Sequence, residues 1–184
     1  MSRIRWFAVL LICLLMHRGD AQSVRSLIND GNGLYKDGKY DEAEINYRKA
    51  LEKEQGLLPG HFNLGNSLSK QKKFDQSTKE FETAAGSAQE KETKAHALYN
   101  IGNNYLDGAH YESAVKSYIE ALKQEPADED AKYNLSYALR KMKDQKQQNQ
   151  KQNNQQQNQQ VTLGWHGDES AVLKRVDAAA RHRG

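Results

Sequence analysis

The chain has 184 residues, of which 37% are hydrophobic, and its mean hydropathy is −0.95. This length suffices for one domain, but so polar a composition leaves part of the chain without a hydrophobic core. The 27 basic and 24 acidic side chains nearly balance, which argues against nucleic acid or an anionic membrane surface as the dominant partner.

The first 21 residues have the pattern of a secretory signal peptide. Arg3 and Arg5 precede an apolar run of eleven residues, and the small residues Gly19 and Ala21 follow it. The run has about half of the roughly 20 residues that a membrane-spanning helix needs. We therefore predict export with cleavage after Ala21; an uncleaved anchor and a lipid attached at Cys13 are the alternatives.

Three segments of similar sequence then follow one another. Their aligned glycines, Gly31, Gly65 and Gly102, are separated by 34 and 37 residues. Each segment also has a small residue, an aromatic residue and another small residue at fixed offsets. These positions are Ala43, Tyr47 and Ala50, then Ser77, Phe81 and Ala84, then Ala114, Tyr118 and Ala121. We predict one pair of antiparallel helices per repeat, in which the glycines and small residues allow close packing around the aromatic rings.

The pattern resembles that of the tetratricopeptide-repeat (TPR) family, whose period is about 34 residues. The pairs Leu64-Gly65 and Ile101-Gly102 match the Leu-Gly pair of that family, and Pro126 matches its terminal proline. The resemblance implies an all-α fold, a solenoid of three helix-turn-helix repeats. The repeats would span about residues 24–57, 58–91 and 95–128.

The chain after the repeats falls into three segments. Residues 129–144 repeat the pattern of a first helix, so we predict a single helix there that caps the solenoid. Residues 145–160 are all Gln, Asn or Lys, which favours a disordered tether because there is no apolar surface to bury. The tail, residues 161–184, is interpreted either as a short amphipathic helix that docks on a partner or as a disordered end.

No residues have the spacing expected of a catalytic or metal site. The histidines after the signal peptide are His61, His96, His110, His166 and His182, and none lies three or four residues from another. The sequence has neither a Gly-x-Ser-x-Gly elbow nor a phosphate-binding loop. Cleavage would also remove Cys13, the single cysteine. We therefore expect a protein that is not an enzyme and uses no cofactor, metal or small-molecule substrate.

In a TPR stack the first helices line a concave groove, and the resemblance assigns partner contacts to that face. Asparagine and aromatic side chains there would suit an extended peptide, because amides both donate and accept hydrogen bonds. The predicted groove residues are Asn32, Tyr35, Phe62, Asn66, Tyr99, Asn103, Tyr133 and Tyr137. The alternative is that the asparagines bond neighbouring helices; Asn63, Asn100 and Asn134 are the better candidates for bridging repeats.

One known specificity of the TPR family, the clamp for a C-terminal carboxylate, is not expected here. Asn32 and Asn63 match the two asparagines of that clamp. However, Ile28, His96 and Asn100 stand where the clamp has basic residues. A bound carboxylate would therefore lack its cationic partners, and we do not predict a ligand of that class.

The order of the segments is similar to that in the TPR proteins of bacterial aerotolerance (Bat) operons. A signal peptide, the stretch YNIGNNY, and DEDAKYNLSYALR leading into a Gln/Asn tract carry this resemblance, whereas the tail departs from it. It implies a periplasmic adaptor in oxidative-stress tolerance whose protein partner is a von Willebrand A-type membrane protein. The alternative is an envelope structural or assembly protein that self-associates through the solenoid ends or the tail.

Overall fold

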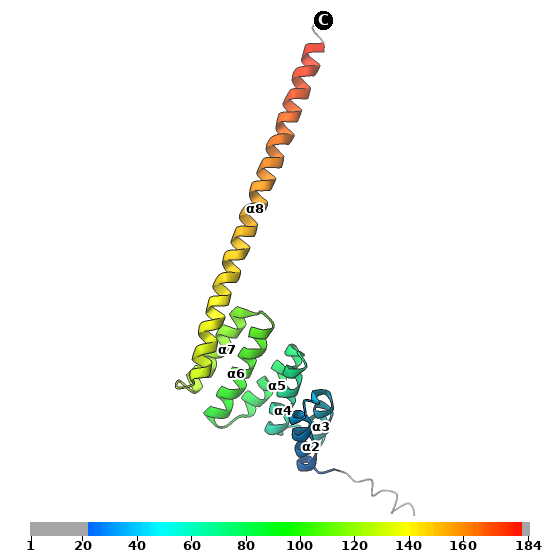
Figure 1. Ribbon diagram of the computed structural model, residues 1–184, viewed down its shortest axis with the longest axis vertical. Coiled ribbons are helices and arrows are strands. Elements are labelled where there is room, and N and C mark those ends of the chain that lie inside the picture. The colour runs from blue at the N-terminus through cyan, green and yellow to red at the C-terminus, as the bar shows by residue number, and fades with distance from the viewer. Residues whose placement is uncertain (1–21, 182–184) are drawn as a thin grey trace, which may run out of the picture. The chain divides into compact units, whose positions relative to one another are not determined.

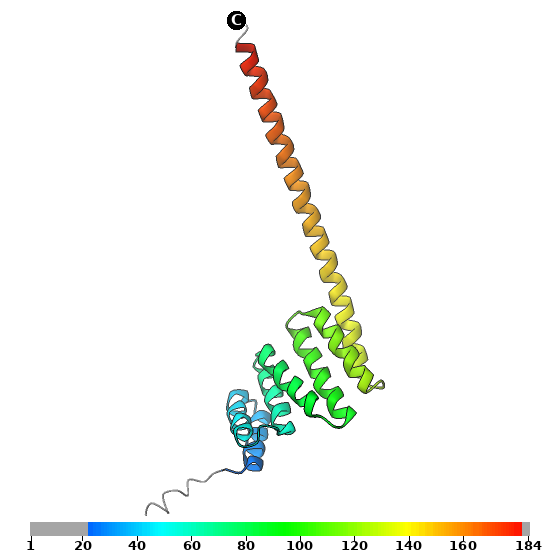
Figure 2. The same ribbon diagram turned by 180° about the vertical axis from the view of Figure 1, so that it is seen from behind.

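The computed structural model describes residues 22–181, so the predicted signal peptide and residues 182–184 lie outside the described residues. The described chain is helical, without strands (Figures 1 and 2). Its helices are α2 (Val24–Lys36), α3 (Tyr40–Lys53), α4 (Leu58–Lys70), α5 (Phe74–Ser87), α6 (Lys91–Asp107), α7 (Tyr111–Gln124) and α8 (Glu129–Arg181). The chain divides within α8 into two units, one ending at Leu135 and the other beginning at Ser136.

The first unit consists of three helix pairs and the start of α8, which confirms the all-α solenoid predicted from the repeats. Helix α2 packs on α3, α4 on α5, and α6 on α7, while α3 with α4 and α5 with α6 join successive pairs. The three pairs follow one another from blue to green in Figure 1. The longer spacing from Gly65 to Gly102 corresponds to a longer first helix in the third pair: α6 has 17 residues, whereas α2 and α4 have 13 each.

The turn between the two helices has the same backbone geometry in every repeat. Gly38, Lys72 and Ala109 occupy equivalent positions and have φ angles of 76°, 60° and 59°. The backbone N–H of the next residue donates a hydrogen bond to the carbonyl five residues earlier, as that of Lys39 does to Leu34 at 2.9 Å. Glycine adopts this left-handed conformation without strain, whereas Lys72 and Ala109 each carry a cost of about 1 kcal/mol.

The aromatic residues of the second helices form the centre of each pair. Tyr47, Phe81 and Tyr118 are each at most 1% exposed. Each ring packs directly on a glycine of the preceding helix. A Cβ atom on Gly31, Gly65 or Gly102 would lie 2.6, 2.9 or 2.5 Å from Cε1 of Tyr47, Phe81 or Tyr118, respectively. The glycines are therefore needed because a side chain would occupy the space of the ring.

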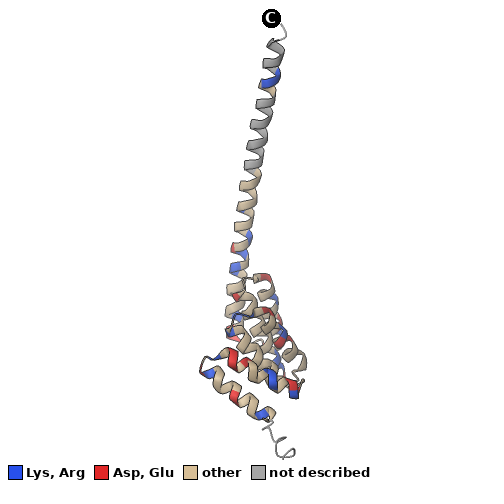
Figure 3. Cartoon of the chain, turned by 90° about the vertical axis from the view of Figure 1, so that its right-hand side faces the viewer, with Lys and Arg blue, Asp and Glu red and all other residues tan. Residues whose placement is uncertain are grey.

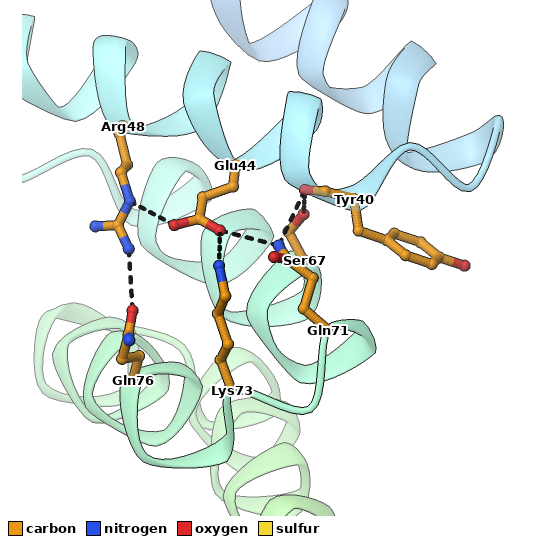
Figure 4. Close-up of polar contacts among 7 residues, drawn as sticks. All are labelled: Tyr40, Glu44, Arg48, Ser67, Gln71, Lys73 and Gln76. Carbon is orange, nitrogen blue, oxygen red and sulfur yellow. Dashed lines mark hydrogen bonds and ion pairs between the residues drawn. The ribbon is translucent and has the colours of Figure 1, made fainter.

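A polar network joins the first helix pair to the second (Figure 4). The carboxylate of Glu44 accepts hydrogen bonds from Arg48 at 2.8 Å and from Lys73 and Gln71 at 3.0 Å each. Gln71 also donates to the backbone carbonyl of Tyr40 at 3.2 Å. Burial alone would raise the pKa of Glu44, but the hydrogen bonds from Lys73, Arg48 and Gln71 outweigh it and lower the pKa.

The length of α8 corrects the sequence prediction for residues 145–160. The helix does not end at residue 144; it continues through the Gln/Asn tract and reaches Arg181 in the tail. The tract is therefore helical rather than a disordered tether. Gln and Lys have favourable helix propensities, and the side chains of residues 145–157 are exposed, so propensity rather than packing explains this helix. Among the described residues, no helix is both long and apolar enough to cross a bilayer.

Candidate functional site

Two adjoining cavities lie along the first helices of the repeats, α2, α4 and α6. The larger has a volume of about 420 Å³ and the smaller of about 170 Å³. Tyr35 and Asn66 line both cavities, so we describe the two together as the groove. The larger cavity is also lined by Ser69, Lys70, Phe81, Tyr99, Asn100, Asn103, Leu106, Asp107 and Asn134. The smaller one is also lined by Asn32, Lys36, Tyr47 and Asn63.

The structure brings five of the eight predicted groove residues together. They are Asn32, Tyr35, Asn66, Tyr99 and Asn103. All five come from first helices, two each from α2 and α6 and one from α4. Each is half-buried, so its side chain combines contacts within the fold with exposure to the groove.

The structure places the other three predicted residues elsewhere. Phe62 packs edge-on against Phe81, with ring centres 5.4 Å apart, and belongs to the border of a core cluster. Tyr133 is 69% exposed and lies outside both cavities. Tyr137 belongs to the second unit, where the Lys141 ammonium lies 5.3 Å from its ring centre. Helical periodicity selects a broad face, and only part of that face lines the groove.

Hydrogen bonds hold two of the groove asparagines in place. The side-chain oxygen of Asn32 accepts from the Tyr47 hydroxyl at 2.9 Å and from the amide of Asn63 at 3.0 Å. Each of these contacts joins α2 to another helix. The alternative reading of the asparagines, that they bond neighbouring helices, therefore applies to Asn32, and Asn63 bridges repeats as expected.

The third repeat has the same arrangement. The side-chain oxygen of Asn103 accepts from the Tyr118 hydroxyl at 2.7 Å and from the amide of Asn134 at 3.1 Å. Asn134 also donates to the hydroxyl of Tyr99 at 3.0 Å. These contacts link α6 to α7 and to the start of α8. Asn103 is thus a structural residue as well as a groove residue.

Several lining residues are absent from the predicted groove set, and Ser69 and Leu106 are two of them. Ser69 and Leu106 face the larger cavity. They lie three residues after Asn66 and Asn103, one helical turn farther along α4 and α6, and residues at this spacing share a helix face. Extending the predicted face by one turn toward the end of each first helix would have found both.

The charged residues of the groove differ in sign from repeat to repeat. Lys36 on α2 and Lys70 on α4 are basic, whereas Asp107 at the equivalent place on α6 is acidic. Among the described residues, none of the three forms an ion pair. Figure 3 shows that acidic and basic residues are otherwise interspersed on the helices of the first unit. The groove therefore has a local polarity rather than one dominant charge.

The histidine with the closest polar contacts has a structural position. His61 on α4 lies 2.7 Å from the carboxylate of Glu80 and 2.8 Å from the backbone carbonyl of Gln55. These contacts tie α4 to α5 and to the preceding turn. In the part of the chain that the structure describes, no three His, Cys, Asp or Glu side chains are grouped so as to hold a metal ion.

Residues 95–128 match the family profile described as the tetratricopeptide repeat, and no curated protein sequence matches the chain. Several solved structures are similar. The first TPR of Spaghetti (RPAP3) bound to the HSP90 peptide SRMEEVD is 24% identical, with a TM-score of 0.60, over 67% of this chain and 95% of that chain. The first TPR domain of human RPAP3 is 22% identical, with a TM-score of 0.62, over 69% of this chain and 98% of that chain. The second TPR domain of human RPAP3, in complex with the HSP70 peptide SGPTIEEVD, is 21% identical, with a TM-score of 0.58, over 62% of this chain and 93% of that chain.

The matched stretch contains most of α6 and all of α7, including the contact between Gly102 and the ring of Tyr118. The similar solved structures extend the likeness in fold to about two thirds of the chain. The chain therefore carries a tetratricopeptide repeat at residues 95–128, within a domain that has the tetratricopeptide-repeat fold.

Proposed function

We propose that this protein is a non-enzymatic adaptor that binds an extended peptide segment of a protein partner in the groove. The observation that carries the proposal is the meeting of asparagine and tyrosine side chains from α2, α4 and α6 along two adjoining cavities. Amides supply donors and acceptors, and tyrosine rings supply apolar contact area, so together they suit a peptide backbone. Two of the similar solved structures hold an HSP90 or HSP70 peptide, which supports a peptide as the ligand class.

The peptide proposed here is not recognised by a free C-terminal carboxylate. Ile28, His96 and Asn100 stand where the carboxylate clamp of the family has basic residues, and only Asn100 of these lines the groove. A bound carboxylate would find amides but no cation at those positions. Amidating the C-terminus of a bound peptide should therefore leave its affinity unchanged, which fluorescence anisotropy measures directly.

Site-specific photo-crosslinking in cells tests the groove as the binding surface. A photoreactive residue at Tyr99 lies in the larger cavity, and one at Ile45 on α3 is the control, because Ile45 is 54% exposed and lies outside both cavities. Mass spectrometry of the crosslinks from Tyr99 should identify one continuous peptide segment. Equal crosslinking of that segment from both positions would contradict the proposal.

The sequence also supports a proposal for the cellular compartment and the partner. We propose export to the periplasm after cleavage at Ala21, and a von Willebrand A-type membrane protein of a Bat-type complex as the partner, because the order of segments supports both. Mass measurement of the protein from a periplasmic fraction should give a chain beginning at Gln22. Crosslinks only to further copies of this chain, with self-association in light scattering, would favour the structural-protein alternative instead.

A further inference from the structure

The second repeat differs from its neighbours in the aromatic residue that packs on the glycine. Repeats 1 and 3 have Tyr47 and Tyr118, whereas repeat 2 has Phe81, which lacks the hydroxyl. The three rings lie in equivalent places, since each comes within 3 Å of a Cβ built on the glycine it covers. A hydroxyl on Phe81 would therefore reach the position from which the two tyrosines donate.

The missing hydroxyl leaves the middle of the groove with unused hydrogen-bonding groups. Asn66 is equivalent to Asn32 and Asn103, whose oxygens each accept two hydrogen bonds and are thus saturated. In contrast, the side chains of Asn66 and of Asn100, the equivalent of Asn63 and Asn134, have no hydrogen-bond partner among the described residues. Both are half-buried and both line the larger cavity.

We propose that Asn66 and Asn100 are the specific site at which the groove binds the backbone of the peptide, and that Phe81 creates this site by withholding a hydroxyl. Each primary amide offers an N–H donor and a C=O acceptor, the same two groups that a peptide unit presents. An extended segment can therefore pair with either amide without any side-chain requirement. Tyr35, Tyr99 and Phe81 flank the two amides, so the peptide pairs with them beside apolar rings.

This inference rests on the proposed function, but it can fail separately. The probe is a fluorescent linear peptide selected on the purified protein from a displayed random library, and its affinity is measured by anisotropy. Phe81→Tyr should add a hydroxyl that donates to Asn66, and should weaken the peptide about tenfold, the effect of one lost hydrogen bond. Asn66→Ala should weaken it to a similar extent. The two changes together should cost no more than either alone, because both remove the same acceptor.

Tyr118→Phe is the matched control. It frees the oxygen of Asn103 from one of its two donors, so peptide affinity should stay the same or rise. Thermal unfolding of each variant checks that the fold is intact. In nuclear magnetic resonance spectra, the side-chain amide signals of Asn66 and Asn100 should shift when the peptide is added to the wild type.

The outcomes separate the two proposals. If substitution of Tyr99 or Asn103 weakens the binding of none of the selected peptides, the groove does not bind peptides and the proposed function is wrong. If the wild type binds a peptide in the groove but Phe81→Tyr and Asn66→Ala bind it equally well while folded, the assignment of the site to the middle repeat is overturned. A loss of affinity in Tyr118→Phe as large as that in Phe81→Tyr would overturn it as well.

Discussion

Gly31 and Gly33 lie two residues apart on α2 but have different surroundings. A Cβ atom on Gly31 would lie 2.6 Å from Cε1 of Tyr47, whereas one on Gly33 would meet nothing within 4 Å. Tyr47 is 1% exposed, so its ring cannot move aside without disturbing the close-packed core. Packing therefore requires a glycine at the first position and not at the second.

Adding one methyl group at each position tests this difference. Gly31→Ala should lower the free energy of unfolding by about 1 to 3 kcal/mol, the usual cost of overpacking a core. Gly33→Ala should raise it by up to about 1 kcal/mol, because alanine favours a helix more than glycine does. Urea unfolding followed by circular dichroism measures both. Similar stabilities in the two variants would show that the ring of Tyr47 does not hold its place.

The hydroxyl of Tyr47 gives a prediction for alkaline pH. Burial, with a smaller contribution from Tyr35, raises the pKa of Tyr47 from 10.0 to about 12. Between these values the unfolded chain has lost the proton and the folded chain still holds it, so each rise in pH favours unfolding. The contribution of Tyr47 to the free energy of unfolding should thus be fully present below pH 10.0 and be lost as the pH approaches about 12.

Thermal unfolding across this range measures the effect, and absorbance at alkaline pH follows tyrosine ionisation. Tyr47→Phe should lose less stability than the wild type over the same interval, because it has no proton to release at this position. Tyr118 and Tyr35, whose pKa values burial also raises, contribute to the part that remains. An identical alkaline slope in Tyr47→Phe and the wild type would contradict the assignment to Tyr47.

At the scale of elements, equivalent positions on the first helices connect each repeat to the one before it. Ser67 on α4 donates to the backbone carbonyl of Tyr40 at 2.6 Å. Asn104 occupies the same place on α6, is 1% exposed, and donates to Ser77 on α5 at 2.8 Å. A buried polar group is expected to be hydrogen-bonded; the amide N–H of Asn104 meets this expectation by a bond that joins neighbouring pairs, whereas its Oδ1 has no partner among the described residues. Asn104 is therefore a residue of the repeat interface rather than of the groove.

The hydrogen bonds of Glu44 connect the first helix pair to the second, and one substitution tests their contribution to stability. Glu44→Gln should lower the free energy of unfolding by about 1 to 2 kcal/mol at neutral pH, because Lys73 and Arg48 lose a charged acceptor. Glu120→Gln is the control: Glu120 pairs with Lys123 but is 49% exposed, so the expected loss is below about 0.5 kcal/mol.

The pKa of Glu44 gives this prediction a pH dependence. Because the folded-state pKa is lowered, the stabilisation is present above the ordinary value of 4.5 and is lost as the pH falls through the lower folded value. The difference between the wild type and Glu44→Gln should therefore shrink in acid. Chemical unfolding at neutral and acidic pH measures it, and a difference that stays constant would show that charge at Glu44 is not the cause.

At the scale of the whole molecule, the charges along the groove change sign from one end to the other, which would orient the proposed peptide. Lys36 and Lys70 lie on α2 and α4, and Asp107 lies on α6, which follows them in the stack. A bound segment with an acidic residue toward the lysines and a basic residue toward Asp107 would match these charges. Charge complementarity of this kind sets orientation and specificity more than total affinity.

Peptides of identical composition with the acidic and basic ends exchanged test this polarity. One order should bind more tightly than the other, and added salt should reduce the difference because exposed charges are screened. Lys36→Glu and Lys70→Glu combined with Asp107→Lys should reverse the preference, because all three charges then change sign. Glu120→Lys, outside the groove, is the charge control. Equal binding of both orders by the wild type would show that these charges do not orient the ligand.

The amount that could be predicted differs between the fold and the groove. The spacing of Gly31, Gly65 and Gly102 with their aromatic partners was enough to predict three helix pairs, because each feature repeats within one local unit. The Gln/Asn tract was misjudged, since composition reports the lack of a core but does not exclude an exposed helix. Phe62 was misplaced because a helix face that points inward can meet either the core or the groove.

By itself, the sequence determined the repeat, the helix pairs and the face on which Asn32, Asn66 and Asn103 lie, because helical periodicity is a property of neighbouring residues. Only the tertiary structure decided which of these amides are already bonded. Their partners come from other helices, as Tyr47 and Asn63 do for Asn32. Whether a hydrogen bond forms depends on distances of a few tenths of an ångström between such segments, and no periodicity along the chain specifies them.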